Sequence, residues 1–138
     1  MYQPNLLAVL VAGLIPMLIG SIWYGPVFGK AWLKLIGKTE EEIRATMNPM
    51  KMYVVTFIMA LVMAYVLAHV LQAFADAYGV TGIPAGLQAA FWIWLGFVLT
   101  IGYQAVAFED KKISLFALNM GYNLVTLLAM GTLLGAWR

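Results

Sequence analysis

The hydrophobic pattern of the chain consists of four long apolar runs separated by short polar segments. The runs cover about residues 5–24, 51–75, 84–108 and 113–137. Apart from Lys51 at the edge of the second run, His69 is the one acidic or basic residue in them. A helix needs roughly 20 apolar residues to cross the hydrocarbon core of a bilayer. The alternation of a membrane β-barrel is absent. The pattern therefore predicts an all-α membrane protein, a bundle of four transmembrane helices.

Composition supports a lipid environment for the whole chain. Of its 138 residues, 64% are hydrophobic and 10% are charged, whereas soluble domains carry about 25% charged residues. The length favours one integral membrane domain over residues 1–138. The chain has no cysteine, which excludes disulfides and thiolate metal sites. Its basic residues are scattered, so we expect no nucleic-acid partner.

The placement of the basic residues predicts the orientation of the helices. Loops with many Lys and Arg residues face the cytoplasm. Seven of the eight basic residues lie in or beside the first and third loops, and the eighth is Arg138. The first and third loops are therefore predicted to be cytoplasmic and both termini outside, in the inner (plasma) membrane of the cell. The seven residues are Lys30, Lys34, Lys38, Arg44, Lys51, Lys111 and Lys112.

Short polar signals predict where the helices in the loops begin. Thr39 and Glu42 have the spacing of a capping box, which opens a short helix. Asn48 followed by Pro49 favours the start of the second span, with asparagine as the cap and proline in the first turn. The turn at residues 109–112 is tight, so we expect the third and fourth spans to be neighbours.

The first span ends in an unusual stretch, GSIWYGPVFGKAW, from Gly20 to Trp32. Proline disfavours a helical residue before it, so the helix should end here and the chain should turn. Residues 26–47 are then predicted to be amphipathic and to lie along the membrane surface. The aromatic–glycine element comprises Trp23, Tyr24, Gly25, Pro26, Phe28, Gly29 and Trp32. It is either an interfacial aromatic belt or a ledge, facing lipid or a ligand, at which Gly25 and Gly29 allow close backbone approach.

Several parts of the chain together resemble a known family. GSIWYGPVFGKAW, a following Thr-Glu-Glu helix and the span FIMALVMAYVLAHV look like the bacterial domain of unknown function 1761 family. The motifs W-x-W-L-G-F at 92–97 and N-M-G-Y-N at 119–123 are similar to it as well. The resemblance covers nearly the whole chain. It implies a small four-span membrane protein, and it supplies no catalytic residues.

Polar residues at membrane depth form the first candidate site. Such residues often mark function in membrane proteins. Asn119 and Asn123 lie one turn apart on the fourth span, and Thr126 continues their face. Simple hydrogen bonding between helices is the alternative, at about 0.6 kcal/mol for each contact. The predicted inner polar cluster comprises Ser21, Tyr24, Thr100, Gln104, Asn119 and Asn123.

A second set of polar residues, the outer polar stripe, follows one face of the second span. It comprises Tyr65, His69, Gln72 and Asp76. A histidine here could relay protons or bind a ligand, and structural hydrogen bonding is the alternative. One histidine without cysteine does not complete a metal site unless subunits share ligands. We therefore expect no metal, no cofactor and no catalytic residue.

Glycine spacing and one proline suggest how the helices pack. Gly131 with Gly135, and Gly25 with Gly29, have the small-xxx-small spacing that permits close helix approach. Pro16 should kink the first span. The two halves of the chain show no convincing internal repeat.

Three classes of function compete. A non-enzymatic membrane protein with a structural or lipid- or small-ligand-binding role is favoured, with membrane lipid and further copies of the chain as partners. An oligomeric transporter or channel for a neutral or anionic solute is the alternative, because no carboxylate for proton-coupled cation export lies within a span. An enzyme is the least favoured, since paired carboxylates at depth and a G-x-S-x-G elbow are absent.

Overall fold

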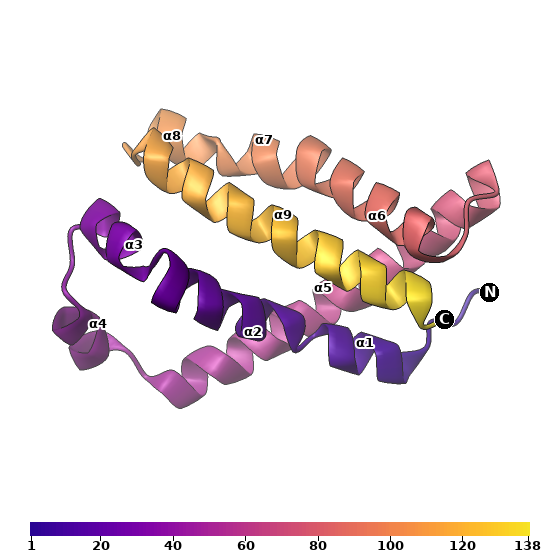
Figure 1. The fold of residues 1–138 in the computed structure, drawn as a ribbon, viewed down its shortest axis with the longest axis horizontal. Helices are drawn as coiled ribbons and strands as arrows, with labels where there is room; N and C mark the ends of the chain where they lie inside the picture. Colours follow the sequence, from indigo (N-terminus) through magenta and orange to yellow (C-terminus); the bar gives the residue numbers. More distant parts are fainter.

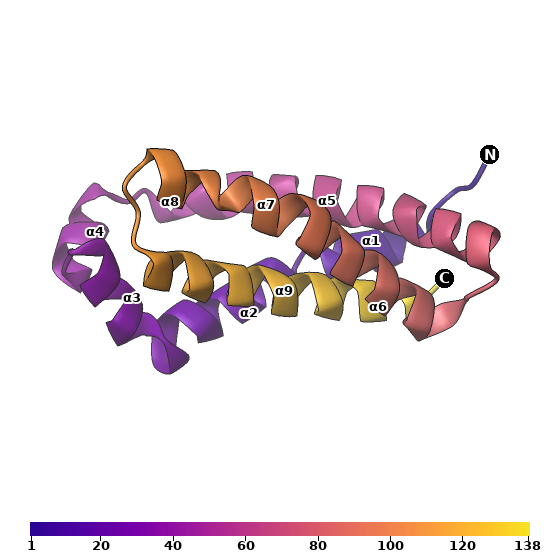
Figure 2. The same ribbon diagram turned by 90° about the horizontal axis from the view of Figure 1, so that it is seen from above.

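The computed structural model describes residues 1–138 and contains helices but no strands. Four helical stretches are long and apolar enough to cross a membrane: Leu6–Val27, Pro49–Tyr78, Gly82–Phe108 and Ile113–Ala136. Every boundary lies within three residues of the predicted one. The stretches run alongside one another (Figures 1 and 2). The predicted all-α membrane bundle is therefore confirmed.

The first span is a broken helix. It consists of α1 (Leu6–Ala12), α2 (Ile15–Ile22) and a kinked turn, η1 (Trp23–Val27). Pro16 lies in the first turn of α2, where its missing N–H leaves no helical hydrogen bond unmade. The predicted kink at this proline is present as the break between α1 and α2.

The segment after the first span forms two short helices, α3 (Gly29–Ile36) and α4 (Glu40–Thr46). Gly37 separates them with a left-handed backbone, φ +71°, which glycine adopts without the steric cost of a Cβ. Thr39 caps α4, because its Oγ1 accepts a hydrogen bond from the Glu42 N–H at 3.1 Å. The predicted helix start at Thr39 is confirmed.

The other spans differ in regularity. The second is one unbroken helix, α5 (Pro49–Tyr78), whose cap Asn48 accepts a hydrogen bond from the Lys51 N–H at 3.3 Å. The fourth is α9 (Ile113–Ala136). The third is subdivided into α6 (Gly82–Ile93), the π-helical turn η2 (Trp94–Val98), α7 (Leu99–Gly102) and α8 (Gln104–Phe108).

The closest helix pair in the bundle is α6 with α9, as predicted for neighbouring spans. A Cβ atom added to Gly86 would overlap the carbonyl oxygen of Gly131, and one added to Gly135 would overlap that of Gly82. Small residues permit this approach in membranes, where lipid provides no hydrophobic force between helices. The predicted close contact at Gly131 and Gly135 is present, and its partner is a second G-x-x-x-G on α6.

The bundle is tightly packed at one end and open at the other. The largest fully buried side chains are Leu67, Leu71 and Met130, which pack with small residues. Those small residues are Ala8, Ala12, Ala64, Ala85, Ala89 and Ala90. In contrast, residues 49–59 at the start of α5 are exposed, apart from the half-buried Phe57.

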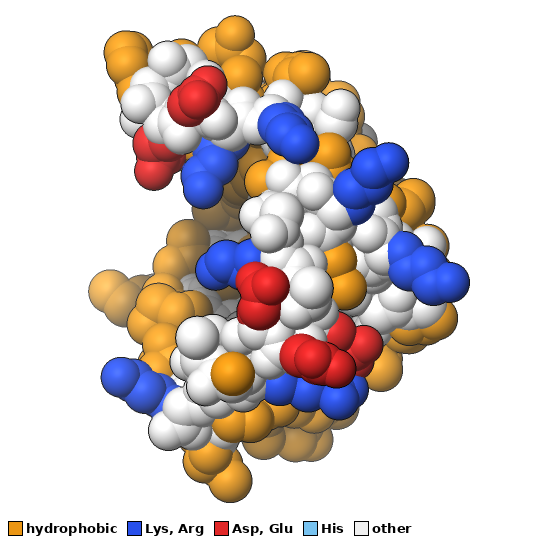
Figure 3. All heavy atoms as spheres, turned by 90° about the vertical axis from the view of Figure 1, so that its left-hand side faces the viewer, with side chains coloured by type: hydrophobic (Ala, Val, Ile, Leu, Met, Phe, Trp, Pro, Cys, Tyr) orange, Lys and Arg blue, Asp and Glu red, His pale blue; other side chains and the backbone are white.

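Charged side chains gather at the open end, which we call the basic end. The loops that carry α3, α4 and the turn after α8 meet there, whereas both termini lie at the opposite end (Figure 1). Figure 3 looks at the basic end and shows Lys and Arg side chains spread across it. The same view shows a hollow on one side that hydrophobic side chains line.

Candidate functional site

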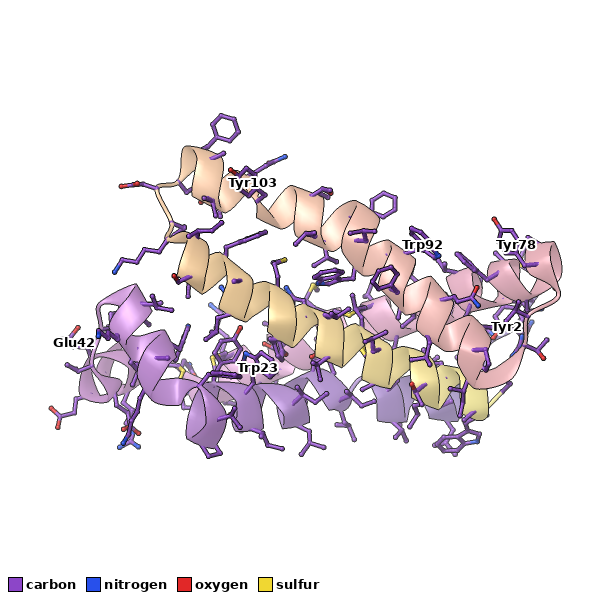
Figure 4. The ribbon with its side chains drawn as sticks, turned by 45° about the horizontal axis from the view of Figure 1, so that its top comes forward. Tyr2, Trp23, Glu42, Tyr78, Trp92 and Tyr103 are labelled. Atoms are coloured by element: carbon purple, nitrogen blue, oxygen red, sulfur yellow. The ribbon has the colours of Figure 1, made fainter.

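Two tryptophans from different spans donate hydrogen bonds to the first third of α9. The Trp23 Nε1–H donates to the Leu118 carbonyl at 3.2 Å, and the Trp94 Nε1–H donates to the Met120 carbonyl at 2.9 Å. The two carbonyls are separated by about 3 Å along the helix axis. Figure 4 shows Trp23 between the first span and α9. The first and third spans are thus fixed to α9 at nearly the same depth.

Each of these tryptophans begins a five-residue turn of the same sequence pattern, W-x-G-x-V. The turns are η1, with sequence WYGPV, and η2, with sequence WLGFV. In η2 the turn is π-helical, a geometry that inserts one residue into a helix and is frequent at functional sites. In η1 the backbone is instead kinked at Gly25. The two halves of the chain therefore share this short pattern. The spacing W-x-G-x-V was the signal that could have identified Trp94.

The rings of the aromatic–glycine element fold onto the bundle. The ring centroids of Trp23 and Phe28 lie 4.7 Å apart, and those of Tyr24 and Trp32 lie 5.2 Å apart. Trp23 covers Gly121 of α9, where an added Cβ would lie 3.1 Å from the indole. Trp23 and Tyr24 are half-buried. They therefore form part of the contact between helices.

The two glycines of this element shape its own backbone. Gly25 has non-helical torsion angles, φ −111° and ψ −105°, and no atom lies within 4 Å of a Cβ added there. A Cβ added to Gly29 would lie 2.8 Å from the Tyr24 carbonyl oxygen, in the preceding turn. Within the chain, therefore, no other helix approaches Gly25 closely. Pro26 has no N–H to donate, so the chain bends here, as Figure 2 shows.

Part of the inner polar cluster converges between the first and fourth spans. The Tyr24 hydroxyl donates to Asn119 Oδ1 at 2.6 Å. Asn123 lies one turn further along α9 and lines the same cavity as Tyr24 and Asn119. The hydrogen bond joins positions 95 residues apart in the sequence.

The other three residues of the cluster do not join this contact. Ser21 donates to the Met17 carbonyl at 2.7 Å, within its own helix. Thr100 donates to the Gly96 carbonyl at 2.8 Å. Gln104 is exposed. Serine and threonine hydroxyls commonly bond to the carbonyl four residues earlier in their own helix. The predicted depth of Ser21 and Thr100 in the membrane therefore did not indicate which groups they bond to.

The converging residues line a cavity of about 650 Å³, which we call the basic-end cavity. Its polar groups come from Tyr24, Lys111, Asn119, Tyr122 and Asn123, and its apolar wall includes Trp32, Leu115, Phe116 and Met120. A neighbouring hollow of about 390 Å³ shares Lys111 and Leu115 with this cavity. The charged residues of that hollow are Lys38, Asp110, Lys111 and Lys112.

Tyr122 is a residue that the sequence analysis missed. Its hydroxyl donates to the Pro16 carbonyl at 2.7 Å, and its ring lies 5.2 Å from that of Tyr24. The accepting carbonyl lies beside the kink in the first span. Backbone polar groups within a membrane need hydrogen-bond partners in the protein, and the Tyr122 hydroxyl is one for this carbonyl. Its position inside the quoted motif N-M-G-Y-N was the available signal.

The outer polar stripe is hydrogen-bonded along α5. Gln72 Nε2 donates to Asp76 Oδ1 at 2.9 Å, and His69 Nδ1 donates to the Tyr65 carbonyl at 2.9 Å. The His69 ring also lies 5.3 Å from the ring of Tyr2, which Figure 4 shows at the end with the termini. No three His, Cys, Asp or Glu side chains lie close enough to hold a metal ion.

Comparison with known proteins places the chain in a family. No curated protein and no solved structure matches the chain. Residues 7–135 match the family model described as "Protein of unknown function (DUF1761)". The match includes the aromatic–glycine element, both tryptophans that contact α9 and the residues of the basic-end cavity. The chain therefore belongs to the DUF1761 family, as the resemblance of its motifs implied.

Proposed function

We propose that this multi-pass membrane protein is a non-enzymatic binder of an anionic lipid, held in the basic-end cavity. The observation that carries the proposal is the hydrogen bond from Tyr24 to Asn119 at the wall of a cavity of about 650 Å³. Ligand pockets of small molecules span about 300–1,000 Å³ and combine apolar walls with a few placed polar groups. The basic-end cavity has this size and this composition.

The charges beside the cavity favour an anionic headgroup. Three lysines, Lys38, Lys111 and Lys112, line the adjoining hollow with one carboxylate, that of Asp110. The hollow thus has an excess of positive charge, which attracts phosphate headgroups. Trp32 and Phe116 line the apolar wall, where an acyl chain would lie. A phospholipid with its phosphate on the lysines fits both parts.

The packing of the opposite end favours binding over permeation. The backbones of α6 and α9 touch at Gly86 and Gly131, and Leu67 and Leu71 fill the same half of the bundle. A channel or transporter for a neutral or anionic solute would need a route past this contact. The basic-end cavity instead lies beside the loops, where lipid headgroups are.

We also propose that the basic end faces the cytoplasm of a bacterium and that the protein forms homo-oligomers in its plasma membrane. The orientation rests on the seven basic residues at or beside the first and third loops, because such loops are retained on the cytoplasmic side. The proposal of an oligomer is based on the exposed apolar side chains that all four spans carry. Such side chains can pack against lipid or against another copy of the chain.

Lipid titration followed by native mass spectrometry tests the binding proposal. Phosphatidylglycerol should form a one-to-one adduct with the purified chain, and phosphatidylcholine should bind more weakly. The Lys111→Gln/Lys112→Gln variant should lose affinity by about fivefold for each lysine. The control, Lys30→Gln/Lys34→Gln, removes two lysines that do not line the cavity or the hollow. Equal losses in the two variants would mean that only general charge matters.

A second variant separates binding from permeation. Asn119→Leu/Asn123→Leu removes both amides from the cavity wall and should weaken phosphatidylglycerol binding without altering solute leakage from liposomes. If this variant instead lost a measurable solute flux at unchanged folded yield, the transporter alternative would replace the binding proposal.

A further inference from the structure

We infer that a second binding site lies in the middle of the bundle and takes a neutral, largely apolar molecule with one hydrogen-bonding group. The site is a cavity of about 400 Å³ to which all four spans contribute, through residues such as Pro16, Met59, Ile93 and Thr126. We call it the mid-bundle cavity. Tyr122 and Asn123 line both this cavity and the basic-end cavity, so the two are adjacent and the inference goes beyond the proposed lipid site.

Thr126 provides the polar group that points to a ligand. Its side chain is among those that line the cavity and is 3% exposed, and its Oγ1 makes no hydrogen bond of 3.5 Å or less within the chain. The hydroxyl of the neighbouring Tyr122 donates instead to the Pro16 carbonyl. Two other threonines in the spans bond to their own helices: Thr100 donates to the Gly96 carbonyl and Thr132 to the Leu128 carbonyl, each at 2.8 Å. Buried polar groups without partners are rare and destabilise a fold. A ligand hydroxyl or carbonyl at Thr126 would satisfy this one.

The remaining wall determines the chemical class of the ligand. No acidic or basic residue lines the mid-bundle cavity, and a charged ligand at this depth would be strongly disfavoured. Asn123 offers a second polar group, an amide, beside the Thr126 hydroxyl. The rest of the cavity wall consists chiefly of aliphatic and methionine side chains. The site therefore suits a long-chain alcohol or ketone.

The ligand would enter from lipid along α5. Thr56, Met59 and Met63 line the cavity from α5 and are exposed on its surface. Toward the basic end, α5 lies apart from α7 and α8, on the other side of α9 (Figure 1). Methionine side chains are flexible and adapt to ligands of different shape. The exposed part of α5 thus forms a rim that molecules dissolved in the bilayer can cross.

Photolabelling of the full chain in nanodiscs tests the site. The probe is a decanol that carries a diazirine next to its hydroxyl, and the matched probe is the same diazirine alkane without the hydroxyl. The decanol should label residues of the mid-bundle cavity and should be displaced by unlabelled decanol. Thr126→Val should raise the concentration of decanol probe needed for half-maximal labelling by about tenfold and leave labelling by the alkane unchanged.

The controls distinguish a hydroxyl contact from a change of shape. Thr126→Ser keeps the hydroxyl and should keep the affinity, whereas Thr132→Val removes a hydroxyl that bonds to its own helix and should have no effect. Unchanged decanol labelling in Thr126→Val, or labelling mapped elsewhere, would overturn the inference. The Lys111→Gln/Lys112→Gln variant should label normally, so failure of the lipid proposal leaves this test intact.

Discussion

Gly86 of α6 and Gly131 of α9 lie so close that neither position has room for a Cβ atom. An added Cβ at either glycine would overlap the carbonyl oxygen of the other. One turn away, a Cβ added to Gly135 would overlap the carbonyl oxygen of Gly82. Two G-x-x-x-G motifs on antiparallel spans thus face each other. Close van der Waals contact of this kind drives helix association in lipid.

Gly86→Ala should destabilise the bundle strongly. Overpacking a well-packed core costs about 1–3 kcal/mol, and here the obstacle is backbone that cannot rotate away. We expect a loss of at least about 2 kcal/mol in the free energy of unfolding, measured by titration with sodium dodecyl sulfate in mixed micelles. Gly96→Ala is the matched control in the same span, because no atom lies within 4 Å of its added Cβ. A similar loss in both variants would contradict the close contact.

Removing either indole donor should loosen the attachment of a span to α9. Trp23→Phe and Trp94→Phe each delete a hydrogen bond to an α9 carbonyl, and each should lower the free energy of unfolding by about 1 kcal/mol. Trp92→Phe is the control, since Trp92 is 55% exposed. The proposed role of the two indole hydrogen bonds is refuted if the control loses as much stability as the two test variants.

The kink in the first span should depend on the Tyr122 hydroxyl. Tyr122→Phe keeps the ring beside Tyr24 and deletes the bond of 2.7 Å to the Pro16 carbonyl. We expect a loss of about 0.5–1.5 kcal/mol and faster amide exchange around Pro16. Tyr78→Phe, at a residue that is 70% exposed, should change neither quantity. Unaltered exchange in Tyr122→Phe would show that the bond does not hold the kink.

Single cysteines should report the orientation, because the chain has none of its own. In intact spheroplasts a membrane-impermeant maleimide should label Thr81→Cys, in the second loop. Lys34→Cys and Lys112→Cys should react only after permeabilisation, because we place their loops in the cytoplasm. Labelling of Lys34→Cys and Lys112→Cys from opposite sides would exclude a four-span topology.

Local chemistry made much of the fold predictable. The spans could be predicted from the length of the apolar runs, because a helix needs about 20 apolar residues to cross the hydrocarbon core of a bilayer. Asn48 and Thr39 marked helix starts because each side-chain oxygen accepts a backbone N–H in the first turn. The Pro16 break followed from the missing N–H of proline. These signals act over a few residues and need no knowledge of the rest of the chain.

The sequence by itself determined that four helices cross the membrane, where they begin and end, and which loops carry the cations. Only the tertiary structure decided that Tyr24 meets Asn119, that Thr100 turns back to its own helix, and that Gly131 faces Gly86. The physical reason is that lipid and the bundle interior are both apolar. Hydrophobicity therefore indicates depth in the membrane but not the direction in which a helix face points, and that rotation is set by side-chain packing between helices distant in sequence.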